Sequence, residues 1–174
     1  MTFEIRSDIT NRSMAIASRA MRRVLRRKRN IIWAIFGWSV FFINALLLIP
    51  FDGEPFTLDA STVISLLVEV MLLSVLLFQD RFNGTIARKN ALAGTKEYHV
   101  AFGEDSYTVV TAATTSTFRY ELIDAMAESQ GYIILLMKKR YVQPLDKRTL
   151  TGGTVEEFKR FLEEKTGKTF RRVK

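Results

Sequence analysis

Few side chains in this chain could do chemistry, and the most unusual of them is an acid inside an apolar run. Glu69 lies near the centre of residues 61–79, STVISLLVEVMLLSVLLFQ. The chain has no cysteine and one histidine, His99. A disulfide framework, a thiolate metal site and a cysteine nucleophile are therefore excluded, and a serine–histidine–acid triad would have to use His99.

Two other groups have a superficial resemblance to functional motifs. His99 is followed by Asp105 and Ser106, but a hairpin strand and its turn would carry them, which predicts a surface histidine. Gly152 and Gly153 precede a helix start and could offer N–H groups to a phosphate, yet without a P-loop pattern they indicate a turn. We therefore expect no catalytic residue, no metal, no cofactor and no enzymatic activity.

Two apolar runs dominate the first half of the chain. Residues 31–50 carry no charge, and twenty residues of helix span about 30 Å, the thickness of a bilayer core. In the second run, 61–79, the apolar side chains favour insertion by about 4–7 kcal/mol, against about 2.5–3.5 kcal/mol for one central acid. The sequence predicts a transmembrane hairpin over 31–79, with a short loop at 51–60.

Charged residues beside the two runs predict the orientation. Nine lysines and arginines lie in the first 30 residues, and Arg81, Arg88 and Lys89 follow the second run, whereas the loop 51–60 has three acids and no basic residue. Basic flanks stay in the cytoplasm. We expect a multi-pass protein of the plasma membrane with both termini cytoplasmic.

Polar residues within the predicted spans form a candidate contact. Counted from the outer ends, Asn44 and Glu69 lie at similar depth, so we expect Glu69 to bond to Asn44 or to Ser39. One interpretation is a neutral acid that holds the hairpin or a dimer together. The other is a proton-binding or partner-binding site, since an ionisable group at this depth is a functional candidate.

A basic cluster precedes the first span. Its members are Arg22, Arg23, Arg26, Arg27, Lys28 and Arg29. They could bind anionic lipid head groups, at about 1 kcal/mol each, or only determine topology. Nucleic acid is not expected, because no recognition motif accompanies the charge.

The remaining residues predict cytoplasmic parts. In 1–30, a strand at 2–6 precedes a helix that Ser7 or Asp8 caps, with an apolar stripe at Met14, Ala17, Met21 and Val24 and a kink near Asn30. A helical linker, 80–96, ends in a hinge at Gly94.

Residues 97–174 predict a small antiparallel β-domain closed by one amphipathic helix. Strands are expected at 98–102, 107–111, 117–122, 132–137 and 140–142, the last ending at Pro144. Thr154 and Glu157 form a capping box for a helix to Lys165, which Gly167 ends. Because so small a domain is marginal alone, we expect the strand at 2–6 to join its sheet.

This pattern resembles the YcxB-like family of bacterial two-span membrane proteins. The resemblance rests on Tyr98–Phe102, the Glu104-Asp105 turn, Tyr120–Ile123, the strand 132–137, the pair Lys147-Arg148 after Pro144, and 156–162. In the family the basic pair directly follows the proline, whereas Leu145 and Asp146 intervene here. The resemblance implies a cytoplasmic β-domain related to pleckstrin-homology folds and no particular activity.

The main functional hypothesis is a non-enzymatic membrane anchor. Its β-domain would bind a protein partner or anionic lipid head groups, with Lys147 and Arg148 as a candidate partner-facing pair. Alternatives are an immunity or stress-protection factor that acts through the hairpin, and an accessory subunit of a transporter or envelope complex. The expected partners are membrane lipid and a protein or second copy of the chain.

Overall fold

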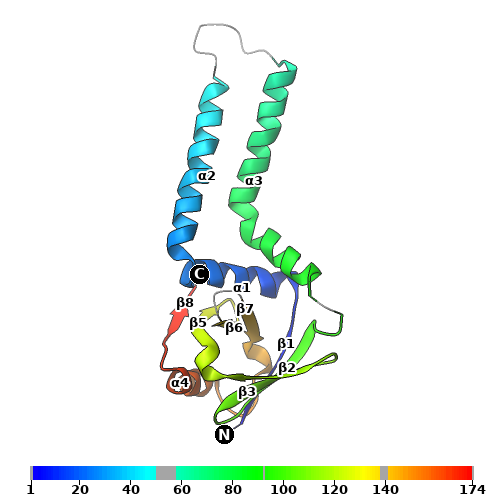
Figure 1. Cartoon of the computed structure of the whole chain (residues 1–174), viewed down its shortest axis with the longest axis vertical. Coiled ribbons are helices and arrows are strands. Elements are labelled where there is room, and N and C mark those ends of the chain that lie inside the picture. The colour runs from blue at the N-terminus through cyan, green and yellow to red at the C-terminus, as the bar shows by residue number, and fades with distance from the viewer. Residues whose placement is uncertain (1, 50–57, 92, 138–140, 174) are drawn as a thin grey trace.

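The computed structural model describes residues 2–49, 58–91, 93–137 and 141–173. Two long helices, α2 (Arg27–Leu47) and α3 (Ala60–Lys89), run side by side and project from a β-rich part that contains both ends of the chain (Figure 1). We call α2 and α3 the helical hairpin. The expected arrangement of a hairpin beside a β-domain is thus present, while the loop expected at 51–60 falls mostly outside the described residues.

The hairpin presents its apolar side chains outward. Ile32, Leu47 and Leu67 are each 66–76% exposed, and both helices are long and apolar enough to cross a membrane. The helix pair is in close contact at Gly37, where an added Cβ would lie 2.7 Å from Leu76 Cδ2. Compared with the predicted spans, α2 begins earlier and ends at Leu47, and α3 continues to Lys89 as expected for the linker.

Among the residues that the structure describes, eight strands form two sheets rather than the single meander that was predicted. The first sheet has the order β1 (Phe3–Asp8), β2 (Glu97–Phe102), β3 (Ser106–Thr111), β4 (Thr115–Arg119). The second has the order β7 (Tyr141–Asp146), β6 (Tyr132–Met137), β5 (Ile123–Ser129), β8 (Phe170–Arg172). Short 3₁₀ turns, η1 (Tyr120–Leu122) and η2 (Lys147–Thr149), follow β4 and β7.

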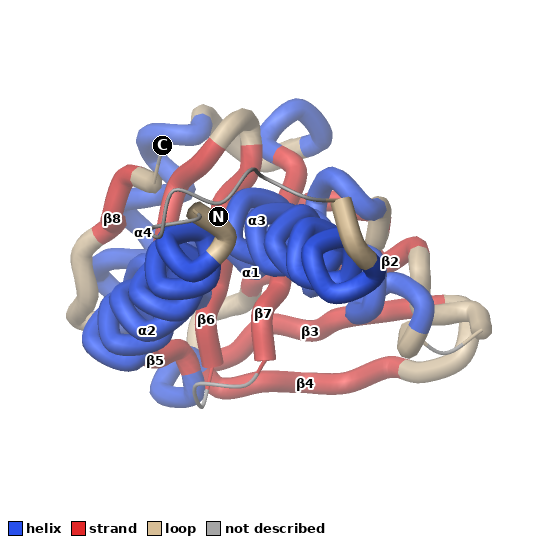
Figure 2. The backbone as a smooth tube through the Cα atoms, turned by 90° about the horizontal axis from the view of Figure 1, so that it is seen from above, coloured by secondary structure: helices blue, strands red, loops and turns tan. Residues whose placement is uncertain are grey.

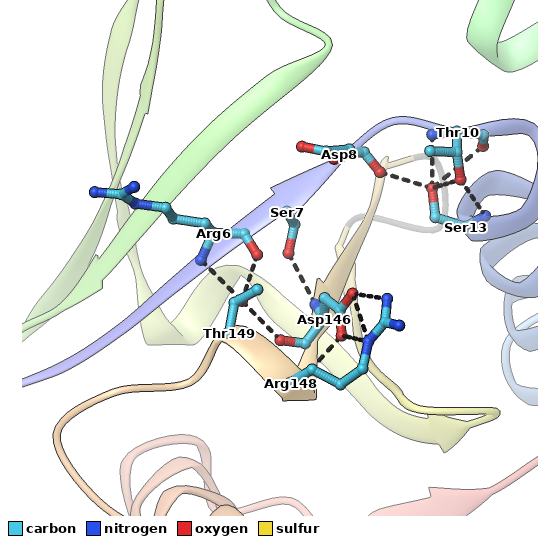
Figure 3. Close-up of polar contacts among 8 residues, drawn as sticks. All are labelled: Arg6, Ser7, Asp8, Thr10, Ser13, Asp146, Arg148 and Thr149. Carbon is cyan, nitrogen blue, oxygen red and sulfur yellow. Dashed lines mark hydrogen bonds and ion pairs between the residues drawn. The ribbon is translucent and has the colours of Figure 1, made fainter.

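The N-terminal strand joins the β-domain, as predicted. β1 pairs antiparallel with β2 from Phe3↔Phe102 to Asp8↔Glu97. Side chains also tie β1 to the end of β7 and to η2: Ser7 Oγ accepts from the Asp146 amide at 2.8 Å, and Thr149 Oγ1 donates to the Arg6 carbonyl (Figure 3). Residues about 140 positions apart in the sequence therefore close one corner of the domain.

The main core lies between the sheets and under α4 (Val155–Thr166). Phe3, Phe102 and Phe158 are at most 2% exposed and pack ring against ring. Thr154 and Glu157 form the predicted capping box, and Gly167 ends α4 with φ +66°. The predicted helix and its closing glycine are confirmed.

Helix α1 (Asn11–Val24) lies between the second sheet and the hairpin (Figures 1 and 2). Its buried face, with Ile16, Ala17, Ala20 and Met21, packs against β5 and β6 side chains. The helix is capped by Thr10 and Ser13, not by Ser7 or Asp8, because those two residues are still in β1. The helix is interrupted at Leu25 and Arg26, between α1 and α2, rather than near Asn30, which lies inside α2.

Two strands were not predicted and one is longer than expected. β5 contains a register shift between Ile123 and Ala125, which obscures its alternation, and β8 has only three residues. β7 does not end at Pro144, which pairs with Ile134. A proline is tolerated there because β7 is an edge strand of its sheet, so one side of the strand needs no ladder donors.

Candidate functional site at the base of the hairpin

A close helix crossing joins the hairpin to α1. At Gly84 of α3, an added Cβ would lie 2.6 Å from the backbone nitrogen of Ala15 and 2.9 Å from its Cα. Only glycine allows the two backbones to approach this closely without displacement. Gly84 itself is buried. The crossing places one turn of α3 directly on α1, so polar residues of both helices meet beside it.

The nearest polar group is Asp80, one turn before Gly84. Asp80 is 8% exposed, and Arg22 of α1 binds both of its carboxylate oxygens, with Nε–Oδ1 at 2.9 Å and Nη2–Oδ2 at 2.6 Å. Arg19 adds a third contact, Nε–Oδ2 at 3.3 Å. A two-pronged arginine–carboxylate pair is geometrically specific, so it fixes the rotation of α3 relative to α1.

A cavity of about 620 Å³ lies beside this ion pair, among α1, α2 and α3. Its lining includes three arginines from two sides: Arg22 from α1, Arg26 from the break between helices, and Arg29 from the first turn of α2. Asn30, Trp33, Gln79 and Asn83 supply further polar and aromatic groups. We call it the interface cavity, because it lies where the apolar hairpin surface meets the polar part.

The charge of the interface cavity is positive. Arg22, Arg26 and Arg29 contribute three positive charges and Asp80 one negative charge, a formal sum of +2. Asn30 Oδ1 contacts Arg22 Nη1 at 3.5 Å and helps to orient it. The lining thus gathers three arginines and several amides around one open cavity, a composition that suits an anionic oxygen-rich group such as a phosphate.

The six basic residues that the sequence grouped together separate in the structure. Arg22, Arg26 and Arg29 line the interface cavity. Arg23, Arg27 and Lys28 are exposed and are not part of its lining among the residues the structure describes. Helical spacing and the break at Leu25 and Arg26 account for the separation, since they turn alternate members of the cluster in different directions.

The polar residues within the hairpin are only partly brought together. Gly37 of α2 contacts Leu76 of α3. Asn44 lies seven residues after Gly37, and Glu69 lies seven residues before Leu76, so Asn44 and Glu69 are at the same level of the two antiparallel helices. Glu69 is 7% exposed, yet within the described chain neither carboxylate oxygen has a hydrogen-bond partner. The expected bond from Asn44 is not formed.

The local geometry explains why neither Asn44 nor Ser39 makes the expected hydrogen bond to Glu69. Asn44 Nδ2 donates instead to the Val40 carbonyl of its own helix, at 3.0 Å. Ser39 is exposed, because five residues on a helix place it about 140° around the axis from Asn44. Ser39 is therefore outside any contact with Glu69.

The candidate partner-facing pair, Lys147 and Arg148, is engaged within the domain. Lys147 Nζ lies 2.5 Å from Glu128 Oε1, and Lys159 Nζ lies 2.8 Å from the other oxygen. Hydrogen bonds from Lys147 and Lys159 lower the pKa of Glu128 to about 2. Arg148 binds the Asp146 carboxylate at 2.6 Å, which holds the pKa of Asp146 below its usual range (Figure 3).

The two motif-like groups have structural explanations. Gly152 has φ +90°, and an added Cβ would lie 2.2 Å from the Thr2 carbonyl oxygen. Gly153 abuts the Phe3 ring in the same way. Glycine is therefore needed at both positions because the start of β1 packs directly against them, and this packing explains the glycine pair without phosphate binding. His99 Nε2 lies 3.2 Å from Glu4 Oε2 on the neighbouring strand.

Several residues of the site were not singled out in the sequence. Arg19, Asp80 and Gly84 join the helices, and Gln79 and Asn83 line the interface cavity. Their signal was present in part, since Gln79, Asn83 and Ala87 recur at four-residue steps after the apolar run ends. Which helix would face them depended on the long-range packing of α1.

Comparison with known proteins supports the resemblance noted in the sequence. Residues 102–162 match the family model described as YcxB-like protein. No curated protein and no solved structure matches the chain. The matched region runs from the last residue of β2 to α4 and contains Val142, but not the helices that form most of the interface cavity. The resemblance to the YcxB-like family is thus confirmed over residues 102–162, and the match does not extend to the two predicted spans.

Proposed function

We propose that this chain is a non-enzymatic integral protein of a bacterial plasma membrane that binds an anionic phospholipid head group in the interface cavity. Helices α2 and α3 span the bilayer, and α1 and the β-domain lie on the cytoplasmic side. The two four-stranded sheets with α4 across one end support a pleckstrin-homology-like architecture for the β-domain.

Exposed apolar surface supports the membrane location. Side chains such as Ile32, Leu47 and Leu67 would be left in water on two helices that little else covers. At about 25 cal/mol per Å² of apolar surface, transfer of such helices into lipid is strongly favourable. Basic residues at the N-terminal end of α2 and the C-terminal end of α3 support a cytoplasmic β-domain.

The observation that carries the head-group proposal is that Arg22, Arg26 and Arg29 all line one open cavity of about 620 Å³ at the end of the apolar helices. A lipid phosphate lies at this level when its chains run along the helices. Basic cavities between membrane helices on the cytoplasmic side are typical head-group sites. Trp33, 64% exposed, lies at the same level, where aromatic residues gather at interfaces.

The test compares two double variants in lipid nanodiscs. Arg26→Gln/Arg29→Gln removes two charges from the cavity lining, and Arg27→Gln/Lys28→Gln removes two charges from the same helix end that are not among its lining residues. We expect the cavity variant to retain phosphatidylglycerol about 30-fold more weakly by native mass spectrometry, at about 1 kcal/mol per basic residue. The Arg27→Gln/Lys28→Gln variant should show a markedly smaller loss. Equal losses would show that only diffuse charge attracts the lipid.

A second candidate function acts through the hairpin itself, as an immunity factor or an accessory subunit. The buried carboxyl of Glu69, which has no hydrogen-bond partner in the described residues, favours it, because a helix of another membrane protein that separates α2 from α3 could supply the missing donor. Co-purification of a polytopic protein in mild detergent, lost on Glu69→Leu and kept on Glu69→Gln, would support this function. Retention of the partner by Glu69→Leu would exclude a role for the carboxyl.

A further inference from the structure

The two sheets have four edge strands, and they differ in how their outer sides are covered. β1 and β4 are the edges of the first sheet, and β7 and β8 are the edges of the second. An uncovered edge strand presents N–H and C=O groups that a strand of another chain can bind, so proteins usually cover, shorten or interrupt such edges. The edge without these protections is the place where a further strand can pair.

The edge at β1 is covered by the segment that follows β7. Glu4 and Thr151 exchange two backbone hydrogen bonds, with N–O distances of 3.2 and 2.9 Å. The Arg6 N–H donates to Thr149 Oγ1 at 3.1 Å, and the same hydroxyl donates to the Arg6 carbonyl (Figure 3). The outer side of β1 is therefore occupied.

The second sheet protects its edges by other means. Pro144 of β7 has no N–H, and its carbonyl accepts a hydrogen bond from the Tyr98 hydroxyl. The Asp146 amide donates to Ser7 Oγ of β1 at 2.8 Å. β8 has only three residues, which is too short for an extended ladder.

The edge at β4 has none of these protections. Its five residues include no proline and no lysine, and its pairing with β3 has no register shift. In the described ranges of the chain, no strand pairs with β4 on the side away from β3.

The ladder between β3 and β4 shows which backbone groups of β4 point outward. The Thr111 N–H donates to the Thr114 carbonyl at 2.8 Å, and hydrogen-bonded pairs recur at every second residue of an antiparallel ladder. The residues between these pairs direct their N–H and C=O groups to the outer side, and in β4 they are Thr115, Thr117 and Arg119. All three residues are exposed, and no described residue hydrogen-bonds to their outer backbone groups.

This edge is complementary to itself in an antiparallel arrangement. When Thr117 lies opposite Thr117 of a second copy, Thr115 lies opposite Arg119, so every outward residue meets an outward residue. The two arginines are then at opposite ends of the pairing, and no like charges face each other directly. Phe118, whose ring stacks on Tyr107 at 5.5 Å, comes within diagonal reach of Phe118 of the second copy. Backbone groups, charges and aromatic rings therefore all fit a second β4.

The direction of β4 suits two copies in one bilayer. Antiparallel strands of one sheet are related by a two-fold axis normal to that sheet. Figure 2 looks along the hairpin and shows β3 and β4 side by side, extended across the view, with β4 at the periphery. The axis therefore runs roughly along the hairpin, as a dimer with both hairpins in the same membrane requires.

We propose that two copies of the chain form a two-fold dimer in which β4 of each copy pairs antiparallel with β4 of the other. The two first sheets then become one continuous sheet of eight strands, four from each copy. The axis direction relies on the membrane location proposed above, whereas the pairing does not involve the head-group site.

Single cysteines in the full chain test the pairing in isolated membranes, since the chain has none of its own. Under oxidation by copper phenanthroline, Thr117→Cys should form a disulfide-linked dimer, because directly paired Cα atoms lie about 5.5 Å apart. Thr108→Cys is the matched control: Thr108 is paired with Thr117 on β3, so its two copies would lie three strand spacings, about 14 Å, apart. We expect about tenfold more dimer from Thr117→Cys than from Thr108→Cys.

Coexpressed variants test the register. Thr115→Cys and Arg119→Cys should cross-link to each other, whereas Thr115→Cys alone should not, because its two copies would lie about 13 Å apart along the strands. Thr117→Lys places like charges opposite each other and should weaken capture of a differently tagged copy about threefold at low salt. Coexpression of Thr117→Lys with Thr117→Glu should restore the capture.

The results that would overturn the dimer are distinct from those that bear on the head-group site. Equal dimer yields from Thr117→Cys and Thr108→Cys would show that only random collisions are trapped, and self-linked Thr115→Cys would contradict the antiparallel register. Arg26→Gln/Arg29→Gln introduced into the Thr117→Cys chain should leave the dimer yield unchanged, whatever its effect on phosphatidylglycerol.

Discussion

At the residue scale, Glu69 is the residue whose position is hardest to reconcile with its chemistry. It is buried on the α2-facing side of α3, at the level of Asn44, and no described residue hydrogen-bonds to its carboxylate. Burial of a polar group without a hydrogen-bond partner destabilises the folded state. Glu69 is therefore retained at a cost to stability, which is the usual mark of a residue kept for another purpose.

Substitution of Glu69 measures that cost. Glu69→Leu should stabilise the hairpin by about 1–3 kcal/mol, because it removes an unsatisfied buried group and adds apolar contact. Glu69→Gln should change stability little. Ser39→Leu is the control, since Ser39 is exposed on the other side of α2. The measurement is unfolding in mixed micelles with rising dodecyl sulfate, and destabilisation by Glu69→Leu would mean that the carboxyl has a stabilising partner.

Glu128 predicts a pH dependence of the β-domain. Its pKa falls from 4.5 to about 2 because Lys147 and Lys159 bind the charged form. A lowered pKa means that the ion pairs stabilise the fold above pH 4.5 and that this contribution is lost as the pH falls toward 2. Because the side chains are about one-quarter exposed, the contribution is about 1–2 kcal/mol after solvent screening.

Thermal unfolding of the full chain at pH 5 and pH 2.5 checks this dependence. Glu128→Gln should lower the melting temperature at pH 5 and show a smaller difference between the two pH values than the unsubstituted protein. Glu164→Gln, an exposed acid on α4, should keep the full difference. An unchanged difference in Glu128→Gln would assign the pH dependence to other carboxyls.

At the scale of elements, α1 is the part that couples the hairpin to the β-domain. One face packs on β5 and β6, and the other meets α3 through Gly84 and the Asp80–Arg22 pair. Because α1 packs on the sheet with one face and is bound to α3 by an ion pair on the other, a movement of α3 would displace α1 relative to the sheet. The interface cavity depends on this coupling, because its walls come from all three helices.

Gly84 provides a test of the coupling. Gly84→Ala places a Cβ 2.6 Å from the Ala15 backbone nitrogen, so the helices must separate, at about 1–3 kcal/mol. Gly37→Ala is the matched control: its Cβ would meet the end of the Leu76 side chain, which can move. Trypsin should cut the Arg22–Arg29 segment faster in Gly84→Ala than in Gly37→Ala. Equal rates would show that the crossing is not tight in solution.

The sequence predicted the elements whose signals are local. The capping box of Thr154 and Glu157, the stripe of Met14, Ala17 and Met21, and the joining of β1 to the sheet are all confirmed. β5 was not predicted because its register shift interrupts the alternation of buried and exposed residues that is typical of a strand. β8 was not predicted because three residues are too few to show such an alternation. The sequence predicts a strand end at Pro144, because a proline in an edge strand cannot be recognised before the order of the strands is known.

The site was predictable only in part, for a related reason. Arg22, Arg26 and Arg29 belonged to a predicted cluster, but their separation from Arg23, Arg27 and Lys28 follows from the helix break at Leu25. Their similar depth in the predicted spans correctly indicated that Asn44 lies opposite Glu69. The side chain of Asn44, however, donates to a backbone carbonyl of its own helix. Depth can be counted from a sequence, but side-chain pairing cannot.

At the scale of the whole molecule, the hairpin, α1 and the interface cavity form one arrangement. The hairpin ends where α1 crosses it, and the interface cavity lies at that crossing. If α2 and α3 span a bilayer, this cavity lies at or just below the cytoplasmic surface. The functional proposals therefore depend on one claim, that the hairpin crosses the membrane with the β-domain inside.

Single cysteines test that claim directly, since the chain has none of its own. Leu58→Cys lies just before α3, and Thr114→Cys lies in the exposed turn between β3 and β4. With a membrane-impermeant maleimide on intact spheroplasts, we predict labelling of the position 58 variant at once and of the position 114 variant only after permeabilisation. Labelling of position 114 in intact spheroplasts, or recovery of the protein from lysate without detergent, would contradict the account.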